Sequence, residues 1–205
     1  MRAELAKLPI REVYRLLAGC IAPRPIAWVS TISPNGHANL APFSFFNGVG
    51  ANPPAVSFSP VNNRDGSKKD TLRNIEANGE FVVNVVPFSL AQAMNHTAAE
   101  YPYETSEFMP AGVTMLPSAK IKPPRVQESP VHFECVTEKI LYLGQGALGA
   151  NLVIGRIVLL EIADSVLASD GSVDPAKLDL IGRLGGDQYV RTREVFEMGR
   201  PPRPA

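Results

Sequence analysis

The strongest chemical signal in the sequence is a group of cationic and hydroxyl side chains at the start of a predicted helix. Residues 62–79 read NNRDGSKKDTLRNIEANG, in which apolar residues recur at helical spacing and Asn-Gly provides a stop. Ser67 is the expected N-cap, with Asp70 following as in a capping box. A helix start presents unpaired N–H groups and a partial positive charge. The side chains that could join them in holding a phosphate are Arg64, Lys68, Lys69 and Thr71. A solvated, well-capped surface helix is the alternative interpretation.

Two further hydroxyl groups come from the strand predicted just before this helix. Residues 55–61 read AVSFSPV, so Val56 and Phe58 face one way while Ser57 and Ser59 face the other. The serine face is either solvated or directed toward a ligand that the helix start also contacts.

A hairpin is predicted at residues 24–44, RPIAWVSTISPNGHANLAPFS. An apolar, β-branched run leads to a Pro-Asn-Gly turn, whose residues suit a tight hairpin. Pro42 lacks an N–H and should lie at a bulge, at an edge or at the end of the returning strand. Asn39, Pro42 and Ser44 would then present polar groups on one surface, where a polar ligand could bind.

The rest of the pattern predicts a mainly β domain with a few peripheral helices. The additional elements are a short helix at 10–19 packed on a sheet, a central strand at 80–88, a second helix beginning near Ser89, two long strands at 131–143 and 151–166, and a short helix starting at Pro175. Residues 101–130 are rich in Pro and lack periodicity, so an irregular excursion with one short strand is expected there. Such long loops often cover a ligand or hold a second subunit.

A glycine motif between the two long strands, GQGALGA, matches the dinucleotide fingerprint GxGxxG. That fingerprint must open a helix, because the pyrophosphate rests on the helix N-terminus. The β-branched run NLVIGRIVLL follows instead, which is poor helix material. We therefore interpret the motif as a hairpin connection.

Composition excludes several function classes. The chain has 205 residues, 45% of them hydrophobic and 20% charged, with a formal net charge of zero. This predicts one globular domain and favours neither a nucleic acid nor a membrane surface as partner. Cys20 and Cys135 are too far apart in sequence for a metal motif, and the three histidines suggest no metal set. With no signal peptide evident, a cytoplasmic location is expected.

Three blocks carry a resemblance to a known family. RPIAWVST, NLAPFSFF and KKDTLRNIEANGEFVVNVV occur in this order and resemble the flavin reductase-like family of FMN-binding split barrels. The resemblance implies a split β-barrel of antiparallel Greek-key type with a few peripheral helices. It also implies three segments: an N-terminal helix at 1–19, the split-barrel domain at 20–190 and a C-terminal tail at 191–205.

The resemblance implies a role for each residue that matches the family motifs. Trp28, Ser30 and Thr31 would line the flavin ring and ribityl region, although a lone Trp is more often core. Asn39, Ala41, Pro42, Phe43 and Ser44 would meet the polar edge of the ring through backbone groups. Ser57, Ser59, Arg64, Lys69, Asp70 and Thr71 would surround the phosphate, Asp70 as a helix cap or backbone contact. Arg24, Arg183 and Tyr189 would form a substrate side that suits the phosphates and ring of a nicotinamide cofactor.

The function that the resemblance implies is an NAD(P)H-dependent FMN reductase. No side chain needs to act as a catalytic residue, because the flavin carries the chemistry. The expected partners are NADH or NADPH, a second copy of the chain in a homodimer, and a separate monooxygenase that takes the reduced flavin. The alternatives are an FMN-dependent oxidoreductase acting on another organic substrate, and a non-enzymatic flavin-binding protein.

Overall fold

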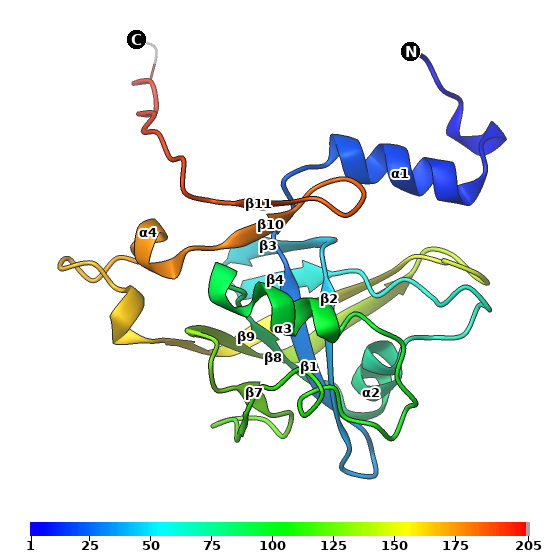
Figure 1. Cartoon of the computed structure of the whole chain (residues 1–205), viewed down its shortest axis with the longest axis horizontal. Helices are drawn as coiled ribbons and strands as arrows, with labels where there is room; N and C mark the ends of the chain where they lie inside the picture. Colours follow the sequence, from blue (N-terminus) through cyan, green and yellow to red (C-terminus); the bar gives the residue numbers. More distant parts are fainter. Residues whose placement is uncertain (204–205) are drawn as a thin grey trace.

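A seven-stranded antiparallel sheet forms the centre of the molecule (Figure 1). The computed structural model describes residues 1–203. The strand order is β2-β1-β5-β8-β9-β4-β3, so β2 and β3 are the two edge strands. The strands are β1 (Ala27–Ile32), β2 (Ala38–Phe43), β3 (Phe46–Ala51), β4 (Pro54–Phe58), β5 (Glu80–Asn84), β8 (Val131–Tyr142) and β9 (Asn151–Ile162). The mainly β class and the central position of β5 confirm the sequence predictions.

The register of the β1–β2 hairpin determines which side chains lie on each face of the sheet. Thr31 pairs with Asn39 and Ala27 with Phe43, whereas Trp28 pairs with Pro42. Because side chains alternate along a strand, the first two pairs share one face and Trp28 lies on the other. Gly36 adopts a φ of 87° in the turn, as predicted for this position.

The first face of the sheet curls around an apolar core. Phe43 of β2, Phe58 of β4 and Phe81 of β5 form a chain of ring contacts with centroids 5.3 Å apart at each step. Strands from distant places in the sheet order therefore meet across the core. Helix α2 (Asp70–Asn78) closes this core with Leu72 and Ile75. The result is a barrel that is not hydrogen-bonded between β2 and β3, which is the predicted split barrel.

The second face is covered by α3 (Ala91–His96), η2 (Phe88–Leu90) and the excursion 101–130. Its core includes Trp28, Leu40, Met94 and Phe108. The excursion carries a two-stranded ladder, β6 (Met115–Leu116) with β7 (Arg125–Val126), where one short strand was expected.

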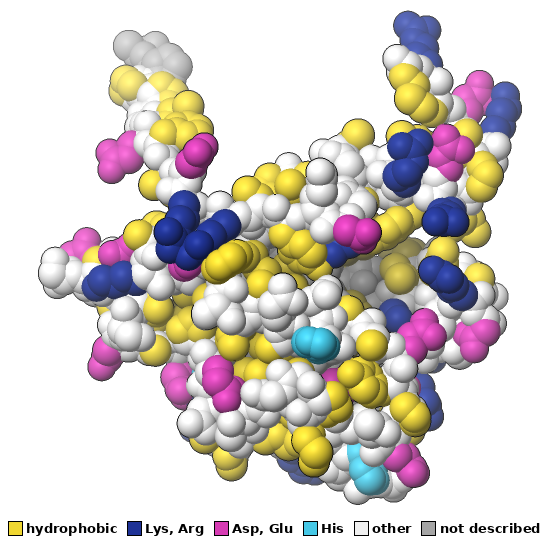
Figure 2. Space-filling model, viewed as in Figure 1, with side chains coloured by type: hydrophobic (Ala, Val, Ile, Leu, Met, Phe, Trp, Pro, Cys, Tyr) yellow, Lys and Arg dark blue, Asp and Glu magenta, His cyan; other side chains and the backbone are white. Residues whose placement is uncertain are grey.

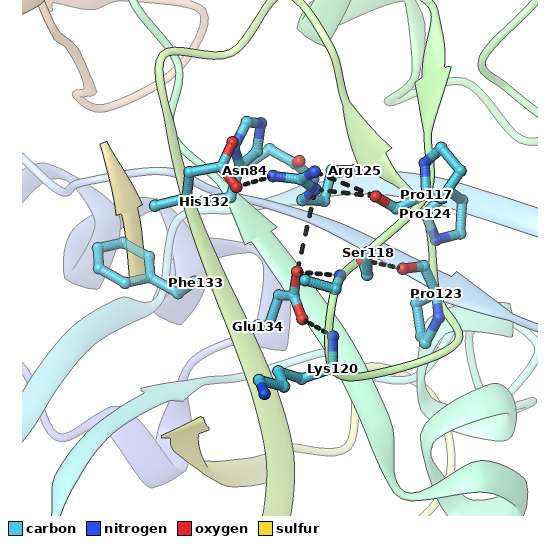
Figure 3. Close-up of polar contacts among 12 residues, drawn as sticks. Asn84, Pro117, Ser118, Lys120, Pro123, Pro124, Arg125, His132, Phe133 and Glu134 are labelled. Carbon is cyan, nitrogen blue, oxygen red and sulfur yellow. Dashed lines mark hydrogen bonds and ion pairs between the residues drawn. The ribbon is translucent and has the colours of Figure 1, made fainter. Parts of the chain in front are cut away.

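A buried polar network fastens the excursion to the second face (Figure 3). Glu134 of β8 is fully buried, and its two carboxylate oxygens accept the backbone N–H groups of Ala119 and Lys120 at 2.8 and 2.7 Å. The Arg125 guanidinium lies beside Glu134, with Nε 3.9 Å from a carboxylate oxygen, and donates to the Pro117 carbonyl. His132 contacts the Val126 carbonyl through Nε2 at 2.8 Å. A carboxylate that satisfies two backbone donors makes the otherwise irregular segment rigid.

The remaining elements lie at the ends of the chain. Helix α1 (Ile10–Cys20) buries only Ala18 and lies on the same side of the molecule as the C-terminal segment, apart from that segment (Figure 1). The prediction that this helix packs on the sheet is therefore wrong: its apolar stripe faces outward. The other elements are η1 (Leu5–Lys7), η3 (Asp164–Val166), α4 (Pro175–Leu178) and the ladder of β10 (Ile181–Arg183) with β11 (Tyr189–Arg191). The last two residues of the predicted tail lie outside the described residues.

The glycine motif forms the connection between β8 and β9, which pair as antiparallel neighbours. The hairpin interpretation is confirmed, because strand β9 and not a helix directly follows the motif. Among residues 1–203, no helix combines the length and apolar character needed to cross a bilayer.

Candidate functional site

A pocket of about 850 Å³ lies where β2, the start of α2 and the segment after α3 converge. We name it the main pocket. This size is ordinary for a site that binds a small molecule or cofactor. Its walls come from residues 39–43, 63–73, 97–103 and Glu107. Eight of the predicted cofactor-binding residues line it together: Asn39, Ala41, Pro42, Phe43, Arg64, Lys69, Asp70 and Thr71.

One end of the main pocket is cationic. Lys69 is the N-cap of α2, but no side chain caps this helix, so its first N–H groups keep no side-chain acceptor. The Lys69 ammonium donates to Asn63 Oδ1 at 2.9 Å, and no hydrogen bond or ion pair of the Arg64 side chain is found within residues 1–203. Free amides, an ammonium and a guanidinium at one helix start suit an anion.

The helix start differs from its prediction at both residues of the expected capping box, Ser67 and Asp70, because no side chain caps α2. Ser67 is not the N-cap: its N–H and hydroxyl both donate to Asp65 Oδ1, at 2.8 and 2.6 Å, and build a turn before the helix. Asp70 forms an ion pair with Arg73 at 3.1 Å. That pairing removes much of the repulsion that a free carboxylate would exert on an anion in this pocket.

The glycine connection 143–150 holds the cationic loop in place. Asn62 donates through its side-chain amide to the Gly146 carbonyl at 3.0 Å, and its N–H donates to the Gly149 carbonyl at 2.9 Å. Asn151 in turn donates to Asn62 Oδ1 at 2.8 Å. A Cβ on Gly149 would lie 2.6 Å from the Gly144 carbonyl oxygen, so the connection requires glycine there. The motif thus has a positioning role that the sequence alone did not suggest.

The other end of the main pocket is an apolar wall formed by the edge strand β2. Ala41, Pro42 and Phe43 line it. The Leu40 N–H points away from β1, because it donates to Glu107. Pro42 occupies the equivalent edge position two residues later and has no N–H to offer. The expected edge position of Pro42 is confirmed. Because Pro42 has no backbone N–H, a planar ring packed on this wall would leave no N–H of residue 42 without an acceptor.

Glu107 lies between these ends and was not identified from the sequence. Glu107 is only 6% exposed, and its Oε2 accepts a hydrogen bond from the Leu40 N–H at 2.8 Å. Burial raises the pKa of the Glu107 carboxyl above its ordinary value; the Leu40 N–H acts in the opposite direction, and the charge of Asp70 raises the pKa further. Its neighbour Phe108 is packed in the second core, which fixes the position of the carboxyl group.

A hydrogen-bonded relay joins β1, β2, α2 and the excursion behind the pocket. The Asn39 amide donates to the Thr71 hydroxyl at 3.0 Å, and the Asn74 amide donates to the Thr31 hydroxyl at 3.0 Å. Tyr103 donates to Asn74 Oδ1 at 2.8 Å, and its ring stacks with the guanidinium of Arg73. These contacts hold the start of α2 in register with β2.

Three predicted ring-lining residues do not line the main pocket. Trp28 is 0% exposed on the second face and donates its indole N–H to the Thr97 hydroxyl at 2.8 Å. Ser30 shares that face and donates to the Pro124 carbonyl. Thr31 lies on the first face but is fully buried within the relay. Successive residues of one strand point to opposite faces, and each face is already packed, so these three side chains lie away from the main pocket.

Four other predicted residues also lie outside the main pocket. Ser44 accepts from Arg24 Nε at 3.3 Å. Arg24 is buried, and its guanidinium donates to the backbone carbonyls of residues 18, 21 and 184, so it has a structural role. Ser59 donates to the Asn151 carbonyl, and Ser57 lies on β4, which pairs with β9 rather than with β1 or β2. Burial and strand order thus separate these side chains from Lys69.

Arg183 and Tyr189 line a second pocket of about 490 Å³, between α3 and the β10–β11 ladder. The Arg183 guanidinium stacks on the Tyr189 ring at 4.5 Å and donates to its hydroxyl. Arg191 stacks on Phe88 at 4.0 Å across the same pocket. Main and second pockets share no lining residue, and α3 with its following turn separates them.

The functional residues that the sequence did not identify come from the non-periodic excursion: Tyr101, Tyr103 and Glu107. The excursion was expected to cover a ligand or hold a subunit, and its Pro content gave that signal. No periodicity indicated which of its side chains point inward. Within residues 1–203, no cluster of three or more His, Cys, Asp or Glu side chains is arranged to hold a metal ion.

Comparisons with known proteins identify the family and the fold. The sequence model of the flavin reductase-like domain matches residues 19–175. An uncharacterised protein of Halalkalibacterium halodurans is 40% identical over 203 residues, which cover 98% of this chain and 97% of that relative. The crystal structure of nitrilotriacetate monooxygenase component B from Bacillus cereus is similar at a TM-score of 0.91, with 37% identity over 97% of this chain and 98% of that one. Pseudomonas fluorescens 2-nitrobenzoate 2-nitroreductase is similar at a TM-score of 0.85, with 30% identity over 98% of this chain and 96% of that one.

Proposed function

Because the chain belongs to the flavin reductase-like family, we propose that it binds FMN in the main pocket and acts as an NAD(P)H-dependent flavin reductase. The observation that carries the proposal is one pocket with an uncapped, cationic helix start at one end and an apolar strand edge without an N–H at the other. A flavin mononucleotide has the matching shape, with an anionic phosphate at one end and a planar ring at the other.

The residues present fit this cofactor. Lys69 and Arg64, with the free N–H groups of α2, would hold the phosphate by charge-assisted hydrogen bonds. Ala41, Pro42 and Phe43 would contact the ring, and the glycine connection would keep the cationic loop in place. FMN is favoured over riboflavin because riboflavin would leave the cationic end without a counter-charge.

When bound, a flavin supplies a ring that accepts a hydride from a reduced nicotinamide and passes electrons on. The chain's own contribution is to bind and orient the reactants. Trp28 supports the pocket from behind by fixing the Thr97 hydroxyl. The excursion, fastened by Glu134, brings Tyr101 and Tyr103 against the pocket.

The second pocket is our candidate for part of the nicotinamide cofactor. Arg183 retains N–H donors beyond those used on Tyr189 and Gly186, and the pocket has aromatic walls beside both arginines. Phosphate and a planar ring are the groups that such walls recognise. Because α3 separates the two pockets within one chain, an extended cofactor would have to pass over α3 or enter from a second copy of the chain.

A homodimer and a separate oxygenase complete the proposal. The apolar stripe of α1 and the exposed apolar residues of the C-terminal segment offer a surface for a second copy. The relative from Bacillus cereus is named as component B of a monooxygenase. By analogy, reduced flavin made here would pass to a partner oxygenase.

A second candidate function is a flavin-dependent reductase acting directly on an organic substrate. The relative from Pseudomonas fluorescens is named as a 2-nitrobenzoate 2-nitroreductase. The second pocket, with Phe88 and Tyr189 as walls and Arg183 as the cation, could hold a planar aromatic acid; the other arginine, Arg191, is paired with Asp179.

The test is an anaerobic titration of the full-length protein with FMN, followed by NADH and then NADPH, monitored by the visible spectrum. Bleaching of bound flavin at catalytic speed, with turnover of added FMN, supports the reductase and identifies the nicotinamide. Rapid reduction of a nitroaromatic acid, with little turnover of free FMN, favours the second candidate. Bound flavin that neither nicotinamide reduces would indicate a non-enzymatic flavin-binding protein, and no flavin binding would contradict all three.

A further inference from the structure

We infer that Glu107 is a positioning and selectivity residue of the main pocket, where it hydrogen-bonds a hydroxyl group of the sugar-alcohol chain that joins a flavin ring to its phosphate. The inference rests on the proposed flavin site and assigns a residue within it. Glu107 is not among the residues that the sequence motifs mark.

The first observation is an unshared oxygen on a buried carboxyl group. Glu107 is more than nine-tenths buried, and its Oε2 accepts the Leu40 N–H. Oε1 forms no hydrogen bond with any other residue among 1–203 and is not one of the enclosed, unpaired polar atoms, so it is accessible where the side chain borders the main pocket. An acceptor oxygen that has no protein partner and is accessible at a pocket wall is available to a ligand group that donates a hydrogen bond.

The second observation is the position of Glu107 along β2. Asn39, one residue before Leu40, is tied to Thr71 at the cationic end of the pocket. Pro42 and Phe43, two and three residues after Leu40, form the apolar wall. At about 3.3 Å per residue, the strand carries Glu107 between the two ends rather than at either one. A flavin with its phosphate at one end and its ring at the other must place its hydroxylated chain in this interval.

The chemistry of the group agrees with that position. A carboxyl oxygen accepts a hydrogen bond from an alcohol, and burial makes such a bond stronger than one at the surface. A carboxylate would be a poor neighbour for the phosphate itself, and Asp70, the other acidic group near Glu107, is already paired with Arg73. The hydroxyl groups between ring and phosphate are therefore the best partners.

Glu107→Gln is the informative variant because it changes little else. The Gln side-chain oxygen can still accept the Leu40 N–H, while the pocket receives an amide N–H₂ in place of an acceptor. Glu107→Ala removes both contacts. Glu104→Gln is the matched control: Glu104 lies in the same excursion, is exposed and does not line either pocket.

The experiment measures the dissociation constants of riboflavin and lumiflavin by fluorescence titration of the full-length protein. Lumiflavin has the same ring but a methyl group in place of the hydroxylated chain. We expect Glu107→Gln to weaken riboflavin binding about five-fold and Glu107→Ala about ten-fold or more, because a charge-assisted hydrogen bond is replaced or lost. Lumiflavin binding should stay within about two-fold in both variants, and Glu104→Gln should match the wild type for both ligands.

Equal losses for riboflavin and lumiflavin would overturn the inference, since Glu107 would then act on the ring or on the packing of β2. Unchanged riboflavin binding in both variants would overturn it as well. A wild-type protein that binds FMN but fails this comparison leaves the proposed function intact. A wild-type protein that binds no flavin refutes the proposed function itself, and the inference with it.

Discussion

At the scale of single residues, Lys69 has the clearest assignment in the main pocket. It is the N-cap of an uncapped helix, and its ammonium has only a neutral partner, Asn63 Oδ1. By contrast, the adjacent Lys68 is neutralised by Glu76, at 2.6 Å. Two neighbouring lysines that are equivalent in the sequence therefore have different capacities to bind an anion.

Replacing Lys69 with Ala should weaken FMN binding by about 1.5–3 kcal/mol, the usual value of a hydrogen bond to a charged group. This corresponds to roughly a ten- to hundred-fold rise in the dissociation constant, measured by flavin fluorescence quenching. Lys139→Ala, at an exposed position of β8 that lines neither pocket, is the control. Equal affinities for Lys69→Ala and Lys139→Ala would refute the phosphate assignment.

His132 illustrates a different effect at the same scale. Burial lowers the pKa of His132, and the nearby Arg125 charge lowers it further, while the Val126 carbonyl, Glu161 and Glu134 act in the opposite direction. The folded protein therefore resists a proton that the unfolded chain takes up below about pH 6.5. Stability should be lost as the pH falls from 7 toward 5, since the unfolded state binds more protons there.

A His132→Gln variant should lose less stability between pH 7 and pH 5 than the wild type does. Gln keeps an N–H donor for the Val126 carbonyl and has no charge to gain. The measurement is the melting temperature over this pH range, with His37→Gln, an exposed histidine in the β1–β2 turn, as control. If His132→Gln and wild type show the same pH dependence, His132 is not the source of the acid sensitivity.

At the scale of elements, the curvature of the sheet depends on β9 approaching β5 and β8 closely. Gly155 of β9 leaves space for the Phe81 ring: a Cβ there would lie 2.3 Å from Phe81 Cζ and 3.4 Å from Cys135 Cβ. The register of β8 and β9 also shifts at two places on β8, between Glu134 and Cys135 and between Thr137 and Lys139. Bulges and a glycine are the usual means by which strands bend into a barrel.

Gly155→Ala should therefore destabilise the protein by about 1–3 kcal/mol through overpacking. The free energy of unfolding in urea measures this loss. Gly48→Ala on the exposed strand β3, where a Cβ would meet nothing within 4 Å, is the control. In the double variant with Gly155→Ala, Phe81→Leu should recover part of the lost stability, because the smaller side chain makes room for the new methyl group. If the losses in unfolding free energy of the two single variants simply add, the clash is relieved elsewhere.

At the scale of the whole molecule, both ends of the chain project from the same side (Figure 1). Figure 2 shows hydrophobic side chains at the surface of both projecting segments. On α1 and its C-cap, one stripe is formed by Ile10, Tyr14, Leu17 and Ile21, and Ile10 is 60% exposed. In the C-terminal segment, Phe196 is 84% exposed. Apolar surface on two projecting segments is typical of an interface between copies of a chain.

The wild-type protein should sediment as a dimer, and Leu17→Glu should shift it toward monomer, because a carboxylate would be buried without a partner. Arg15→Ala, on another side of α1, changes the net charge by the same amount and should leave the dimer intact. Sedimentation velocity over a range of concentrations measures both. A wild-type monomer, or a Leu17→Glu variant that remains dimeric, would contradict the interface on α1.

The sequence by itself determined the local structure and the family. An apolar, β-branched run and a Pro-Asn-Gly turn placed β1 and β2, and alternation placed β4. The Asn-Gly pair ended α2 at Gly79 in a left-handed conformation, and β-branched residues after GQGALGA excluded a nucleotide-binding helix. The alternation of side chains along a strand already separates Trp28 and Ser30 from Thr31, so the sequence itself indicates that these three side chains cannot share one surface.

Only the tertiary structure decided which face of each strand meets the pocket and which meets the core. That choice depends on the elements that cover each face: α2 on one side, and α3 with the excursion on the other. Contacts between residues far apart in the chain decide three of these positions. Trp28 is buried against Thr97, Ser59 is hydrogen-bonded to the Asn151 carbonyl, and Glu107 lies at the edge of β2. Sequence periodicity records the geometry of one element at a time, so it carries no information about these distant partners.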